Sequence, residues 1–160
     1  MVCATADDPN NFQRFFSLPL PDAPTPRVDL STFRLPNSTH PEKYDIFLTT
    51  NVHKAEFEFI GKVQITLKTT EATREIVLHQ RQLTINAVSL TSTADTPTVI
   101  PLDEVPFTYD EPKEFLVIHS RDDLTSDTQY MLTIDYNGTL RTDMGGFYRS
   151  SYTNPEGETV

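Results

Sequence analysis

Residues 56–67, EFEFIGKVQITL, alternate between apolar and polar side chains along most of their length. Successive side chains of a β-strand point to opposite faces of a sheet, so this period of two predicts a strand with one face on a core and the other in water. The glycine within it, Gly61, predicts a bulge or a sharp bend. The expected core side consists of Phe57, Phe59, Gly61, Val63, Ile65 and Leu67.

Further stretches with strand character follow one another at short spacing, and none has the periodicity of a long amphipathic helix. Their connections are rich in Asp, Asn, Pro and Thr, and Asp110–Lys113 is typical of a hairpin turn. The pattern predicts an all-β fold, either an antiparallel β-sandwich or an open saddle-shaped barrel. The expected strands are 44–51, with Tyr44, Ile46 and Leu48 on one face, then 75–80, 83–90, 105–110, 114–120 and 129–138.

The first 31 residues differ from the rest of the chain because they hold five prolines and no sustained periodicity. Proline offers no backbone donor and favours extended backbone, so residues 1–31 are expected to be an extended tail or linker. Residues 32–160 are then expected to be the single β domain of the chain.

Charge and composition exclude several classes of function. The formal net charge is −10, which repels phosphate and argues against nucleic-acid partners and anionic membrane surfaces. Cys3 is the sole cysteine, so neither an internal disulfide nor a cysteine-based zinc site is possible. The start of the chain lacks the features of a signal peptide, and no apolar run reaches 18 residues. We expect a soluble chain that is either cytosolic or without its targeting segments.

The sequence offers no catalytic or metal-ligating constellation. The four histidines, His40, His53, His79 and His119, are not spaced as metal ligands, and H-E-x-x-H does not occur. Paired carboxylates lie in expected loops, where they are usually solvated. The Gly145-Gly146 pair predicts a turn with positive φ, because no basic helix start follows it to hold a phosphate.

Two N-glycosylation sequons occur, Asn37-Ser38-Thr39 and Asn137-Gly138-Thr139. Both lie at expected strand ends, where a glycan can be accommodated. Asn37 and Asn137 are therefore the glycosylation candidates, and they favour a protein of the secretory pathway.

Four segments in sequence resemble the aminopeptidase N family of zinc metallopeptidases, in the family's order and over roughly residues 32–160. The resemblance is strongest in the last, whose GGFYRSSY ending looks most like arthropod gut-surface members. The segments are FRLPNSTHPEKYDIFL (33–48), FEFIGKVQITL (57–67), EIVLHQRQLTI (75–85) and YMLTIDYNGTLRTDMGGFYRSSY (130–152).

This resemblance implies the amino-terminal β domain of a membrane-associated or secreted enzyme that removes amino-terminal residues from peptides. In the family this domain packs on the catalytic domain and helps form the substrate cavity. The family's H-E-x-x-H and Gly-Ala-Met-Glu-Asn motifs do not occur here, so this segment is expected to be inactive alone, with zinc held elsewhere in the full-length protein. Signal peptide and membrane anchor are likewise absent from it, although an extracellular or cell-surface location is implied.

The closing segment, GGFYRSSYTNPEGETV, contains the candidates for contact between domains: Phe147, Tyr148, Arg149 and Tyr152. One interpretation places Phe147, Tyr148 and Arg149 in a core with a buried ion pair near the domain boundary. The other places them against the catalytic domain. A turn is expected at Asn154–Gly157, followed by the first residues of a strand at Glu158–Val160, so the domain would be cut within its final strands. If Arg149 is buried and paired, its replacement by alanine should destabilise the fold by one to several kcal/mol, about what a broken buried pair loses.

Two alternative functions remain open from the sequence. The chain is either a free-standing β-sandwich that binds a protein or carbohydrate partner at the cell surface, or a non-enzymatic relative, since this β domain also occurs in an intracellular transcription-initiation subunit. The first alternative can coexist with the enzyme reading, because the gut-surface members it resembles are docking sites for foreign proteins.

Overall fold

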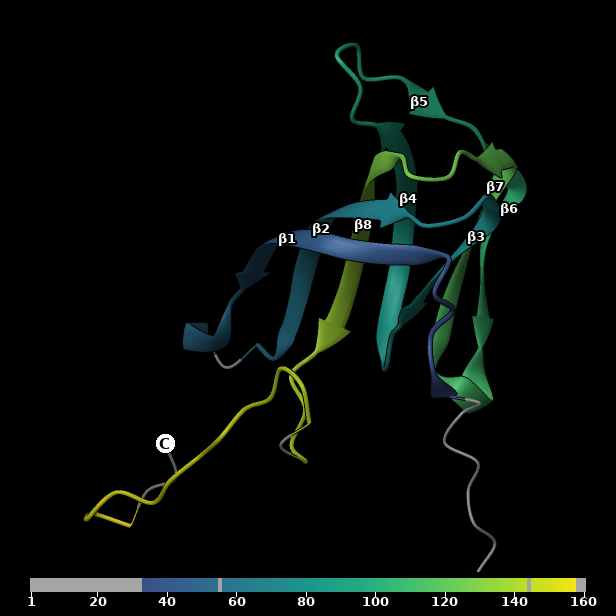
Figure 1. The fold of residues 1–160 in the computed structure, drawn as a ribbon. Helices are drawn as coiled ribbons and strands as arrows, with labels where there is room; N and C mark the ends of the chain where they lie inside the picture. The colour runs from purple at the N-terminus through teal and green to yellow at the C-terminus, as the bar shows by residue number, and fades with distance from the viewer. Residues whose placement is uncertain (1–32, 55, 144, 158–160) are drawn as a thin grey trace, which may run out of the picture. The chain divides into compact units, whose positions relative to one another are not determined.

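The computed structural model describes residues 33–157 except residues 55 and 144, and in this part the chain forms two antiparallel sheets (Figure 1). The large sheet has the strand order β1-β2-β8-β4-β5, and the small sheet has the order β3-β7-β6. The strands are β1 Thr39–Thr50, β2 Glu58–Thr69, β3 Thr73–His79, β4 Leu83–Ser92, β5 Val99–Ile100, β6 Leu102–Asp110, β7 Phe115–Leu124 and β8 Gln129–Thr139.

The expected fold class is confirmed in its sandwich form, since two separate sheets face one another and neither closes into a barrel. The 3-10 turns that lie wholly within the described residues are Val52–Lys54 and Glu111–Lys113. A search of the same residues found no helix long and apolar enough to span a membrane. The proline-rich stretch 1–31 and the strand expected at Glu158–Val160 lie outside the described part of the chain.

The seven strands expected between residues 44 and 138 are all present, and most of them are longer than predicted. Strand β5 was not expected. The hairpin turn predicted at Asp110–Lys113 is confirmed: the 3-10 turn there connects β6 to β7, and Glu114 follows it with a φ of 56°. The turn predicted at Asn154–Gly157 is also confirmed, because the Gly157 amide donates to the Asn154 carbonyl at 3.0 Å. Of the glycine pair, Gly146 has the expected positive φ, 65°.

Strand β8 lies at the centre of the large sheet and carries its most continuous buried row. It pairs with β2 on one side and β4 on the other, over nearly its whole length. The small sheet covers this row with the inward side chains of β3 and β7, such as Ile76 and Ile118. The buried row of β8 is Tyr130, Leu132, Ile134 and Tyr136.

A buried hydroxyl closes the connection from β7 to β8. Thr69, at the end of β2, is fully buried and donates from Oγ1 to the carbonyl oxygens of Thr125 and Thr128. The Thr69 Oγ1 also accepts from the Thr128 amide at 3.2 Å. The Thr128 carbonyl also accepts from the Thr69 amide at 3.0 Å, so backbone and side chain of Thr69 together hold the turn against β2.

The expectation of a bulge at Gly61 is wrong. Gly61 pairs with Leu48 on β1 and with Tyr136 on β8, and neither register shifts there. The bulge between β1 and β2 lies instead between Pro41 and Lys43. Gly61 is required because the Tyr136 ring lies over it: a Cβ at this position would lie 2.3 Å from Tyr136 Cζ.

Replacing Gly61 with alanine should therefore lower the free energy of unfolding by about 1–3 kcal/mol, as overpacking does in other cores. Urea unfolding of Gly61→Ala, Tyr136→Leu and the double variant measures the coupling. In the Tyr136→Leu background the added methyl group should be neutral or stabilising, because glycine is entropically unfavourable within a strand. An equal loss in both backgrounds would contradict the role given to the Tyr136 ring.

Candidate functional site

The core face of β1 is left open, and this is the most unusual feature of the described surface. Leu48, Ile46 and Tyr44 stand opposite Gly61, Val63 and Ile65, so they point to the same side as the buried row of β2. They are nevertheless 43%, 59% and 51% exposed. The alternation predicted for 44–51 is confirmed, but the expected burial of its apolar face is wrong, because the small sheet does not cover β1.

Two cavities follow this open face. One, of about 450 Å³, lies between β1 and the inward side chains of the small sheet, and Leu35 contributes to its wall. The other, of about 350 Å³, lies between β1 and the segment that follows β8. Both are lined by Ile46, Leu83 and Tyr136, so they form one apolar groove along the core face of β1, called here the inner groove.

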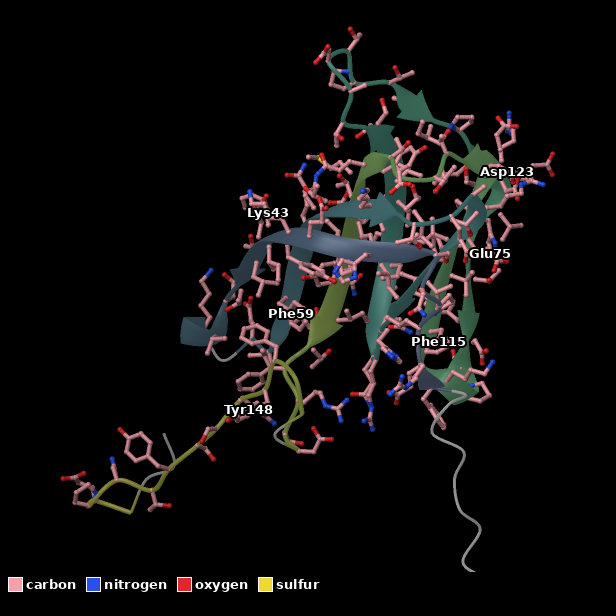
Figure 2. All side chains as sticks on the ribbon, viewed as in Figure 1. Lys43, Phe59, Glu75, Phe115, Asp123 and Tyr148 are labelled. Carbon is pink, nitrogen blue, oxygen red and sulfur yellow. The ribbon has the colours of Figure 1, made fainter. Side chains whose placement is uncertain are left out.

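A loop of residues 141–149 forms the far wall of the inner groove. Backbone bonds close this loop: the Arg141 amide donates to the Phe147 carbonyl at 3.2 Å, and the Arg149 amide donates to the Arg141 carbonyl at 2.8 Å. The Phe147 ring meets the Phe59 ring edge to face, with centroids 5.2 Å apart. Figure 2 shows Phe59 and Tyr148 at the same end of the large sheet. The loop is thereby held against β2.

Arg141 fixes the shape of this loop. Its Nε donates to Asp143 Oδ1 at 2.7 Å, its Nη2 donates to Asp143 Oδ2, and its Nη1 donates to the Gln82 side chain. The hydrogen bonds from Arg141 lower the pKa of Asp143 to about 2, with a smaller contribution from the Gly145 amide. The same pairing raises the pKa of Arg141. A bidentate pair of this kind restricts the loop geometry more than a lysine would.

The interface candidates lie at the surface of this loop and the segment after it. Phe147 and Tyr148 are each 44% exposed, so their interpretation as core is wrong. Tyr152 is 66% exposed. Arg149 is also exposed, and its guanidinium carbon lies 3.9 Å from the centre of the Phe57 ring. The expected buried ion pair is thus replaced by an exposed cation–π contact.

The two glycosylation candidates lie in different settings. Asn37 precedes β1, and its carbonyl oxygen accepts a hydrogen bond from Thr70 Oγ1. Asn137 lies within β8, opposite Ile60 on β2, on the face of the large sheet away from the core. Both asparagines are exposed.

Side chains of the types that ligate metal ions also occur among the described residues. Within that part of the chain no three His, Cys, Asp or Glu side chains come together in a group that could hold a metal ion. Within the same limits every buried side-chain nitrogen and oxygen has a hydrogen-bond partner. We therefore assign no metal ligand to this segment, and the inner groove is best suited to contact with apolar side chains.

Sequence reasoning did not find the inner groove or the Arg141 cluster. The openness of β1 depends on which strands the small sheet covers, and local periodicity carries no information on that. One local signal existed: Phe47 breaks the alternation and is as exposed as Ile46, at 59%, on the opposite face. Apolar residues on both faces are unusual for a strand with one solvated side.

Comparison with known proteins gives a consistent result. A family model described as the Peptidase M1 N-terminal domain matches residues 40–160. The chain is 33% identical over 137 residues to a membrane alanyl aminopeptidase of Manduca sexta, which covers 79% of this chain and 14% of that protein. It is 32% identical over 130 residues to aminopeptidase N of Homo sapiens, covering 75% of this chain and 13% of that protein. The chain is 32% identical over 142 residues to glutamyl aminopeptidase of Rattus norvegicus, and the match covers 87% of this chain and 14% of that protein. The chain thus spans about a seventh of the length of these curated relatives.

The Asp143 carboxyl should titrate far below the ordinary value of 3.8, because Arg141 binds its charged form. The pair therefore stabilises the loop fully above about pH 4, and this contribution is lost as the pH falls through about 2. The NMR shift of the Gly145 amide, which donates to Asp143 at 3.3 Å, reports this titration. The midpoint of this titration should lie near pH 2. The titration should be absent in Asp143→Asn. A midpoint near pH 4 in the wild type would show that the pair does not form.

Arg149→Ala should destabilise the chain by only about 0.5–1 kcal/mol, since exposed cation–π contacts contribute that much. Urea unfolding of the variant, with Phe57→Leu as the partner in a double-mutant cycle, isolates the contact with the ring. If Arg149→Ala lowered the free energy of unfolding by several kcal/mol whether or not Phe57 was present, the interpretation of Arg149 as part of a buried ion pair would be correct after all.

Proposed function

The chain belongs to the Peptidase M1 N-terminal domain family, and on that premise we propose that residues 32–160 are the amino-terminal β domain of a zinc aminopeptidase, packed on the catalytic domain of the same polypeptide. The parent protein removes amino-terminal residues from peptides. This domain contributes a wall of the substrate cavity and performs no chemistry itself. The proline-rich stretch 1–31 leads into it.

The observation that carries this proposal is the inner groove. Tyr44, Ile46 and Leu48 present apolar side chains on the same side as the domain core, yet sheet coverage ends before it reaches them. Fully burying one such side chain stabilises a protein by about 1.5–3 kcal/mol. A further polypeptide segment that covered these three side chains would therefore be held by a favourable free energy of apolar burial. Phe147 lines the same groove and packs on Phe59 near the start of β2.

Zinc and the groups that bind the substrate amine belong, on this proposal, to the catalytic domain. When bound there, zinc would supply Lewis-acid chemistry for peptide hydrolysis. The described residues of this chain supply a rigid surface, since β2 and β8 hold the groove walls in register. Names such as membrane alanyl aminopeptidase among the relatives support a parent protein at a membrane. The two sequons favour a location outside the cytosol. The net charge of −10 argues against a nucleic-acid partner.

The parent protein with Ile46→Asp should lose stability and aminopeptidase activity, whereas Phe47→Asp should change neither. The two residues are adjacent and equally exposed, at 59%, but they lie on opposite faces of β1. A carboxylate in a buried contact loses hydration as well as apolar burial, so the parent should melt several degrees lower with Ile46→Asp. Differential scanning calorimetry and hydrolysis of aminoacyl arylamides measure the two effects.

The same two substitutions in the isolated chain provide the matched control. There both positions face water, and each change should stay within about 0.5 kcal/mol. Equal effects of Ile46→Asp and Phe47→Asp in the parent would overturn the proposal. They would favour instead a free-standing β-sandwich whose groove binds a separate partner.

A further inference from the structure

A second hollow lies at the end of the large sheet where β1 connects to β2, and its walls include Asn137 and Ile60 from the outer face as well as Phe57 and Phe59. Because side chains alternate along β8 and Tyr136 is buried, Asn137 points away from the core. Its direct neighbours across the ladder are Ile60 on β2 and Thr84 on β4. Asn137 is therefore on a central strand, with a sheet surface on both sides of it.

The hollow beside Asn137 has a volume of about 680 Å³ and combines polar and apolar groups. Carboxylates, amides and hydroxyls are the natural partners of sugar hydroxyl and acetamido groups. Ile60 supplies an apolar surface that is 67% exposed directly opposite Asn137. The groups that matter here are Thr49, Asn51, Glu56, Glu58, Ile60 and Asn86.

We propose that Asn137 carries an N-linked glycan whose first N-acetylglucosamine lies in this hollow and covers Ile60. The sequon Asn137-Gly138-Thr139 supplies the acceptor. In the modification, Asn137 Nδ2 loses a proton and bonds to C1 of the sugar. The C1–O bond to a lipid pyrophosphate donor breaks, and the pyrophosphate leaves with the electron pair. The inference rests on the proposed function, because this donor acts only in the secretory pathway.

The geometry favours this occupant for two reasons. A sugar ring has polar edges and faces rich in C–H groups, which match the polar rim and the Ile60 side chain. The glycan would also leave the inner groove free, because Asn137 and Ile46 lie on opposite faces of the large sheet. Modification at Asn137 is thus compatible with packing of the core face on another domain.

The second sequon serves as an internal comparison. Asn37 lies outside the ladders, and the next residue, Ser38, is buried, with its carbonyl oxygen bonded to the Thr70 amide. A glycan on Asn37 would start from a loop and not from the surface of a sheet. A glycan on Asn37 would report entry into the secretory pathway without reference to the hollow at Asn137.

The first measurement is the occupancy of Asn137 in the parent protein isolated from its source. Release with peptide N-glycosidase in ¹⁸O-water, followed by mass spectrometry of the peptides, should mark Asn137. In secreted recombinant protein, Thr139→Ala should abolish the mark and Thr139→Ser should retain it, while Asn37→Gln should leave it unchanged. An unmodified Asn137 in a protein found outside the cell overturns the inference and leaves the proposed function standing. A parent protein found in the cytosol overturns both the inference and the proposed location.

The second measurement tests whether the sugar lies in the hollow. Secreted protein trimmed by an endoglycosidase to the first N-acetylglucosamine should melt about 2–4 °C above Thr139→Ala, a shift typical of one small favourable contact. The difference should disappear when Ile60→Ser is added to both proteins. A difference that survives Ile60→Ser, or none in the wild type, would show that the glycan projects into solvent.

Discussion

The continuous burial of one face of β8 is the constraint on which the rest of the structure depends. Its row from Tyr130 to Tyr136 fixes the registers of β2 and β4, because a shift of one residue would place all four side chains in water. The close contact between Tyr136 and Gly61 locks the β2 register a second time. The positions of Asn137 on one face and of the inner groove on the other both follow from this register.

The small sheet then decides which part of the large sheet is core and which part is surface. It covers β8 and β4 but not β1, so the same period of two produces buried residues in β2 and open ones in β1. At one end of the large sheet the 141–149 loop provides part of the cover that the small sheet does not, because Phe147 packs there on Phe59. The loop keeps its shape through Arg141 and Asp143, and its aromatic side chains therefore stand at a defined place on the rim.

Sequence alone predicted the elements well and their surroundings poorly. Alternation located the strands because it is a local property of the backbone, and the hairpin at Glu111 follows from local turn chemistry. The burial of Tyr44 or Arg149 depends instead on which distant segment lies above, and no local pattern encodes that. Gly61 illustrates the difference: a mid-strand glycine signals close approach or a bulge equally, and only the position of the Tyr136 ring distinguishes them. The interface role of Phe147, Tyr148, Arg149 and Tyr152 stays a prediction.

The bulge near Pro41 has a consequence for handling the chain in isolation. β1 is an edge strand, and proline, charge and a bulge protect only its first half. Beyond the bulge the edge is regular, it is unpaired within the described residues, and Ile46, Phe47 and Leu48 place apolar side chains on both of its faces. Such an edge is a template for intermolecular strand addition, opposed only by the repulsion between acidic molecules. Colloidal stability of the purified segment should therefore fall as salt screens that repulsion, and aggregates should nucleate from this half-strand.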